Sequence, residues 1–143
     1  MKQRAILLAV LAAVVIGLMV WLAAYVRLPL GMAVFANSSF TGQVFDLTMA
    51  VMLAFVLVIG LMRLVRPTMA PSPFLNFMSL GGPVLGLLAF LREASVIWFT
   101  VKMTHATGFH LIAPTLIEAL AMPAIGLIAG ALASAFAAPS AKA

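Results

Sequence analysis

Charged side chains are scarce in this chain of 143 residues, of which 8% are charged and 66% are hydrophobic. An ordinary soluble domain has roughly 25% charged residues, whereas the mean hydropathy of this chain is +1.26. This composition excludes a water-soluble globular protein, and no segment is long or polar enough to form a separate soluble domain. We therefore predict an all-α integral membrane protein that forms a single membrane domain over residues 1–143.

Cysteine is absent, which excludes a disulfide, thiolate chemistry and a cysteine-based metal site. His105 and His110 lie five residues apart with no carboxylate beside them to complete a ligand set, so we predict no metal and no cofactor. Nucleophile elbows, phosphate-binding loops and carboxylates paired at catalytic spacing are also missing from the sequence. We expect no catalytic residue and no enzyme activity.

The formal net charge of +5 does not indicate a nucleic-acid partner. The eight cations are scattered at the ends of apolar segments instead of forming one basic face. The sequence instead predicts that membrane lipid surrounds the protein.

Four segments contain the roughly 20 mainly apolar residues that a membrane span requires. They are residues 5–26, 44–62, 76–101 and 111–138. The first exceeds the roughly 7–15 apolar residues of a signal peptide, so we predict a retained span with Trp21 and Tyr25 as interfacial anchors. Polar and glycine residues fill the first loop, 29–42, and three prolines make the second loop, 63–75, short and irregular.

The cations predict the orientation, because loops rich in Lys and Arg stay on the cytoplasmic side. With the amino terminus inside, the cytoplasmic side carries five cations: Lys2, Arg4, Arg63, Arg66 and Lys142. The opposite side carries three: Arg27, Arg92 and Lys102. We therefore predict that both termini and the loop 63–75 are cytoplasmic.

Two acidic residues near the predicted outer side have simple explanations. Asp46 falls in the first turn of the second span, where a carboxylate suits the helix dipole. Arg92 and Glu93 interrupt the third span, so either the helix ends near Leu91 and residues 94–101 form an interfacial segment, or it continues to Val101 with a buried charged pair. Adjacent residues on a helix point about 100° apart, so these two need not pair. They are expected to form an interfacial pair without a function.

The third and fourth spans each carry a stripe of mainly small residues that leads to a carboxylate, at spacings of three and four in the third span and of four in the fourth. The third-span stripe is Ser79, Gly82, Gly86, Ala89 and Glu93, and the fourth-span stripe is Glu118, Met122, Gly126, Gly130 and Ser134. In lipid, such small faces let helix backbones approach, although glycine and alanine are common in any membrane helix. We expect the two spans to pack on each other or on neighbouring copies, while the first two spans, rich in large side chains, face lipid.

Glu118 is the only charged residue between Leu111 and Ala138. A carboxylate near the bilayer centre costs roughly 2.5 to 3.5 kcal/mol, so such residues usually face other helices, a cavity or an ion path. Glu118 is therefore a candidate proton-path carboxylate. Two alternatives are a structural hydrogen bond, to Thr115 or a partner chain, and a shallow, partly hydrated position.

The fourth span resembles the last transmembrane helix of the MotA/TolQ/ExbB proton-channel family. The resemblance is carried by Ala113-Pro114, by Glu118-Ala119-Leu120 and by the run 124–127, Ala-Ile-Gly-Leu. The third span is similar to the preceding family helix through Leu80, Gly82, Val84 and Gly86. Together these matches cover residues 76–138.

The resemblance implies a small subunit of the bacterial inner membrane in which the large cytoplasmic region of the family is reduced to about residues 63–75. Family members form rings, typically pentamers, around single-span partners of the ExbD/TolR/MotB type, whose membrane aspartate carries the proton. A homo-oligomer that assembles through the third and fourth spans, with such a partner, is the corresponding expectation here.

Two positions depart from the family pattern, because its pore threonines fall on Pro83 and Pro123. Proline offers no side-chain hydrogen bond, but it leaves the carbonyl four residues earlier free to bind water or an ion. Those carbonyls belong to Ser79 and Ala119. The sequence thus predicts a proton-conducting subunit or, alternatively, a structural or assembly subunit of a larger membrane complex that transports nothing.

Overall fold

The computed structural model describes residues 2–27, 40–105 and 108–137. Over these residues the structure contains four α-helices and no strand: α1 (Lys2–Val26), α3 (Phe40–Val65), α4 (Pro73–Thr104) and α5 (Phe109–Ala137). Each helix is long and apolar enough to cross a membrane. The prediction of an all-helical chain with four candidate spans is confirmed.

The helices extend a few residues beyond the predicted apolar segments, because backbone hydrogen bonding continues past the last apolar residue. The connection between α3 and α4 is therefore residues 66–72, shorter than the predicted 63–75. The α4 helix is continuous through Arg92 and Glu93, so the alternative in which it ends near Leu91 is wrong. Most of the predicted first loop, together with Ala138 and Lys142, lies outside the described residues.

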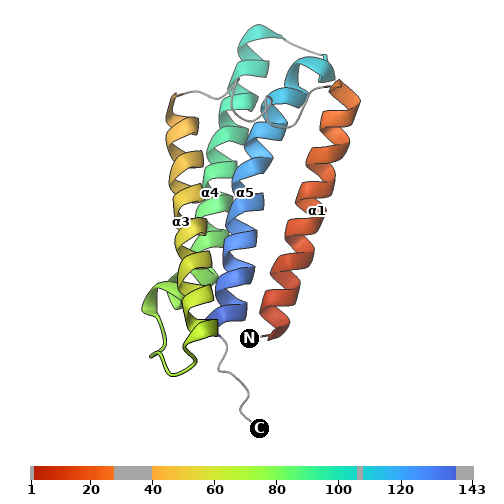
Figure 1. Ribbon diagram of the computed structural model, residues 1–143. Coiled ribbons are helices and arrows are strands. Elements are labelled where there is room, and N and C mark those ends of the chain that lie inside the picture. The colour runs from red at the N-terminus through yellow and green to blue at the C-terminus, as the bar shows by residue number, and fades with distance from the viewer. Residues whose placement is uncertain (1, 28–39, 106–107, 138–143) are drawn as a thin grey trace.

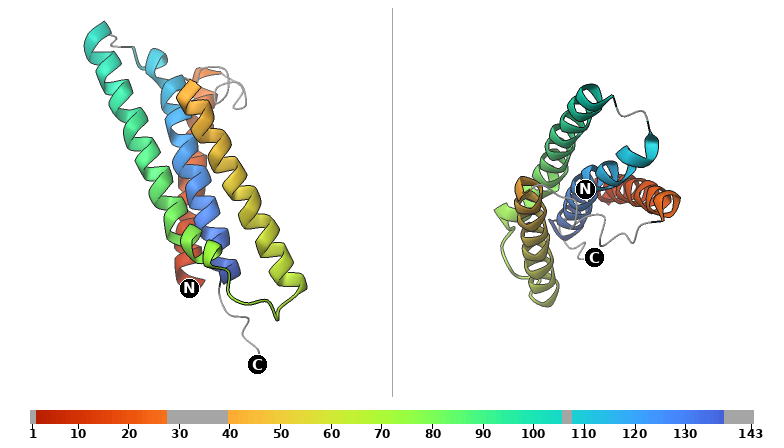
Figure 2. Two further views of the ribbon diagram at one scale, coloured as in Figure 1. Left: turned by 90° about the vertical axis from the view of Figure 1, so that its left-hand side faces the viewer. Right: turned by 90° about the horizontal axis from the view of Figure 1, so that it is seen from above.

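Successive helices run in opposite directions (Figure 1). We call the end of the bundle where α4 ends and α5 begins the distal end, and the end that contains the start of α1 and the end of α5 the proximal end. The α5 helix lies at the centre, with α1, α3 and α4 around it (Figure 2). Its most apolar stretch is 67% buried inside the protein, against 22–33% for the other three helices.

The α1 helix packs on α5 through apolar side chains that include Met19, Leu22 and Ile117. Near the distal end, the Tyr25 ring stacks on the His110 ring with 5.2 Å between centroids. Trp21 stacks in turn on Tyr25 at 5.8 Å. The residues predicted as interfacial anchors therefore form one aromatic group with the first turn of α5.

Glycines let α4 and α5 approach until their backbones touch. A Cβ atom built on Gly82 would lie 2.9 Å from the carbonyl oxygen of Gly126, and one built on Gly86 would lie 2.9 Å from that of Met122. The ring of Pro83 fills the space beside Gly130, where a Cβ atom would lie 2.6 Å from the ring. All five residues of the third-span stripe are buried. The two small-residue faces thus pack on each other within one chain.

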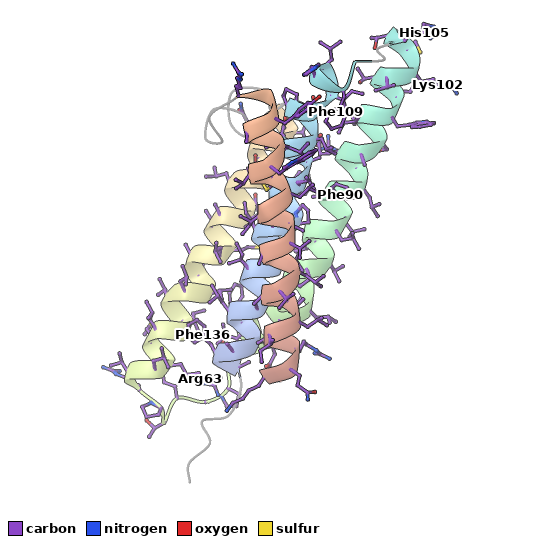
Figure 3. The ribbon with its side chains drawn as sticks, turned by 90° about the vertical axis from the view of Figure 1, so that its right-hand side faces the viewer. Arg63, Phe90, Lys102, His105, Phe109 and Phe136 are labelled. Atoms are coloured by element: carbon purple, nitrogen blue, oxygen red, sulfur yellow. The ribbon has the colours of Figure 1, made fainter. Side chains whose placement is uncertain are left out.

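At the proximal end, a side chain of α3 completes the end of α5. The Arg63 Nη1 atom donates a hydrogen bond of 2.7 Å to the Phe136 carbonyl oxygen, and both residues lie at this end of the bundle (Figure 3). The last carbonyls of a helix lack partners within the helix, and a cation there also suits the helix dipole. This bond fixes the proximal end of α3 against α5.

Substitution of Gly86 tests the backbone contact. In Gly86→Ala the new methyl group would meet the Met122 oxygen and the Pro123 Cα atom, at 2.9 and 3.0 Å, and neither backbone atom can turn away. We expect a loss of about 1–3 kcal/mol in the free energy of unfolding in detergent, the usual cost of overpacking. The matched control is Gly17→Ala, because a Cβ atom there meets nothing within 4 Å. Equal stability of the two variants would contradict the close approach of α4 and α5.

Candidate functional site

All three acidic residues of the chain are buried in the bundle. Asp46 comes from α3, Glu93 from α4 and Glu118 from α5, with exposed fractions of 4%, 9% and 4%. Carboxylates are almost never fully buried unless they are paired. We call these three residues the acidic cluster.

The acidic cluster follows from the packing of the three helices that carry it. Met49, Ala89 and Met122, one from each of α3, α4 and α5, pack together as a buried apolar group, which we call the apolar layer. Each carboxylate lies three or four residues from its member of this layer, always toward the distal end. Residues three or four apart share one face of a helix. The three carboxylates therefore form the next layer of the same interface.

The carboxylates lie close enough to affect one another electrostatically. Glu118 experiences the charges of both Glu93 and Asp46, and Asp46 experiences that of Glu93. Like charges in a low-dielectric interior repel strongly. The cluster consequently favours binding of a positive charge or a proton.

Arg92 supplies one positive charge at the edge of the cluster. Its Nη1 atom lies 3.2 Å from the Glu93 Oε1 atom, the one ion pair within the described ranges 2–27, 40–105 and 108–137. The Arg92 guanidinium also lies 5.8 Å from the centroid of the Phe45 ring, so it bridges α4 to α3. The adjacent residues do pair, and Glu93 is buried while the side chain of Arg92 is 43% exposed. Glu93 is thus buried between the helices, while Arg92 lies at their surface.

Asp46 is the least satisfied member of the cluster. Both of its carboxylate oxygens are buried and have no hydrogen-bond partner in the part of the chain that the structure describes. Because α3 begins at Phe40, Asp46 lies in the second helical turn, and the predicted first-turn position is wrong. A buried acceptor without a partner costs about 1–3 kcal/mol, and more when it is charged. A proton, a water molecule or a cationic group would remove this cost.

The other predicted residues lie proximal to the cluster. Gly82, Gly86, Gly126 and Gly130 form the contact between α4 and α5, where Pro83 and Pro123 also pack. Ser134 is buried one turn beyond Gly130, and its hydroxyl has no partner among the described residues. These residues are structural neighbours of the acidic cluster and not members of it.

The two histidines do not join the cluster. His105 ends α4 in the left-handed conformation, with φ of 51°, and His110 lies in the first turn of α5 against Tyr25. Within the described residues, no group of three or more His, Cys, Asp and Glu side chains could hold a metal ion.

Sequence reasoning did not identify Asp46 as a site residue, although a signal was present. The buried face of α3 contains Gly42, Asp46, Met49, Val56 and Gly60, at helical spacing. Two glycines on the face of Asp46 indicate that this face packs closely on another helix. A carboxylate on such a face points into the bundle, as Glu93 does at the end of the third-span stripe.

Comparison with models of known protein families, with curated proteins and with solved structures finds no match to this chain.

Replacement of Asp46 by an apolar residue tests whether its carboxylate lacks a partner. Asp46→Val removes both buried oxygens with little change in volume, so we expect the free energy of unfolding in detergent to rise by about 1–3 kcal/mol. Thr48→Val is the control, because Thr48 is exposed on the same helix and its hydroxyl bonds only to the Val44 carbonyl, at 2.7 Å. A clear loss of stability in Asp46→Val alone would mean that the carboxylate has a stabilising partner.

Proposed function

We propose that this protein is a multi-pass subunit of the bacterial inner membrane, related to the MotA/TolQ/ExbB proteins, that transfers protons at the acidic cluster. In this proposal both termini are cytoplasmic, so the distal end and the cluster lie toward the outer side. The observation that carries the proposal is the convergence of Asp46, Glu93 and Glu118 at one level of a mainly apolar bundle.

The charge balance of the cluster suits proton exchange. Three carboxylates face one guanidinium, so full ionisation leaves an excess of negative charge in a buried site. Uptake of a proton by any one carboxylate reduces the repulsion on the other two. Protons would then pass between the carboxylates through water molecules, because the Asp46 oxygens have no hydrogen-bond partner among the described residues.

Glu118 is the central residue in this proposal. It lies on α5, the helix that contacts α1, α3 and α4. The charges of Glu93 and Asp46 both act on its carboxylate. Pro123 leaves the Ala119 carbonyl without its helical hydrogen bond, next to Glu118 in the chain. That carbonyl offers an acceptor for a water molecule at the level where the family has a threonine hydroxyl.

The expected homo-oligomer and its single-span partner belong to the same proposal. The glycine faces of α4 and α5 pack on each other within one chain, so contacts between copies would use the helix faces that remain exposed. On α4 this is an apolar face that includes Leu80, Val84, Leu87 and Leu91. Such a face suits either lipid or a second copy.

Proton flux into liposomes tests the proposed function. We expect Glu118→Gln to lower the flux about 100-fold, within the range for loss of a positioned proton-transfer group. Thr48→Val, at an exposed position that bonds only within its own helix, should leave the flux unchanged. Equal flux from the protein and its Glu118→Gln variant, or none from either, would remove the transport proposal.

A non-transporting structural or assembly subunit is the second candidate. The contacts of the two prolines favour it, because the Pro83 ring packs on Gly130 and the Pro123 backbone lies against Gly86. Residues at the family's pore positions thus serve packing between helices. Purification in mild detergent distinguishes the candidates: a homo-pentamer favours the channel, and a single copy bound to unrelated proteins favours the assembly role.

A further inference from the structure

The distal ends of α4 and α5 diverge (Figure 2). Side chains of these two helices line a cavity there. Its volume is about 270 Å³, enough for several water molecules. Five of its lining side chains are apolar and three are threonines, namely Thr100, Thr104 and Thr115. We call this space the distal cavity. Lys102 and His105 lie at the same end of α4 (Figure 3).

The distal cavity reaches the level next to the acidic cluster. On α4 its lining residues begin with Val96 and Ile97, which lie three and four residues after Glu93. On α5 its innermost lining residue is Thr115, three residues before Glu118. Three residues of helix correspond to about 4.5 Å along the axis. One helical turn therefore separates the floor of the cavity from two of the carboxylates.

The threonines leave hydrogen-bonding capacity for water. The Thr100 hydroxyl donates to the Val96 carbonyl at 2.9 Å, and the Thr104 hydroxyl donates to the Thr100 carbonyl at 2.7 Å. Each hydroxyl oxygen still has lone pairs that can accept a hydrogen bond. Water in the cavity thus has polar contacts on α4, and Thr115 supplies a hydroxyl on the opposite wall.

The proximal side of the cluster is closed in the part of the chain that the structure describes. The apolar layer of Met49, Ala89 and Met122 lies directly beneath the carboxylates. Beyond it, the backbones of α4 and α5 touch at Gly82 and Gly86, which leaves no room for water between them. Exchange of water with the cluster is therefore expected from the distal side.

We propose that the distal cavity is the water-filled access route by which protons from the distal side reach Glu118 and Glu93. The inference deepens the proposed function, on which it rests, by assigning the entry path to a space between two helices of one chain. The competing occupant is lipid, which would fill the cavity and keep water out of it.

Single cysteines test this route, because the chain has none of its own. Thr115→Cys and Ile97→Cys place a thiol on the cavity wall, one on each helix. Phe99→Cys is the matched control: Phe99 is exposed on α4, nearer the distal end than Ile97, and outside the cavity lining. The probe is a charged, membrane-impermeant thiol reagent, applied to open membrane fragments so that both faces are accessible.

We expect both cavity cysteines to react about tenfold or more faster than the control, because a thiol reacts as the thiolate, which needs water. If the rate of labelling depended only on distance from the distal end, Phe99→Cys would react faster than Ile97→Cys, since Phe99 lies closer to the end of α4. Reaction at Thr115→Cys and Ile97→Cys no faster than at Phe99→Cys would overturn the route and indicate that lipid fills the cavity. The two cavity variants lie on different helices, so if one of them does not fold, the labelling rate of the other still tests the route.

The labelling and flux measurements separate the two proposals. Fast labelling of both cavity cysteines, without any flux that depends on Glu118, supports the route and contradicts proton transport. Flux that depends on Glu118, with slow labelling at both positions, supports transport and overturns this route.

Discussion

The contact of the α4 and α5 backbones at Gly82, Gly86 and Gly126 is the constraint on which the rest of the structure depends. It sets both the separation and the register of the two helices, because a Cβ atom at any of the three glycines would meet backbone atoms of the other helix. With this register, Ala89 packs against Met122. Glu93 and Glu118 then lie one turn further along, at the same level.

The third helix of the site is placed by different interactions at its two ends. Arg63 binds the end of α5 at the proximal end, and Met49 packs into the apolar layer nearer the distal end. Asp46 follows from that position, since it lies one turn from Met49 on the same face of α3. Its carboxylate oxygens are buried and have no hydrogen-bond partner among the residues that the structure describes, so burial of Asp46 has an energetic cost that the apolar and Arg63 contacts of α3 offset.

Much of this fold could be predicted from the sequence, because four long apolar segments fix the number of helices and small residues at helical spacing mark their closest contacts. The third-span stripe indicated the buried face of α4, including Glu93 at its end. The site itself could not be predicted in full. Periodicity shows which face of a helix is buried but not which helix covers that face, so Asp46 looked like an ordinary residue near a helix end. The limits of the helices were also underestimated, since an apolar window ends at the first charge whereas backbone hydrogen bonds continue.

The central position of α5 has a consequence for the order of assembly. Ribosomes make α1, α3 and α4 first, yet in the finished bundle α1 packs mainly on α5, and α3 contacts α4 only slightly. Until the last helix is synthesised, the three earlier helices have few surfaces to share with one another. Assembly of the complete bundle therefore waits for α5, because α1 and α3 make most of their contacts with that helix.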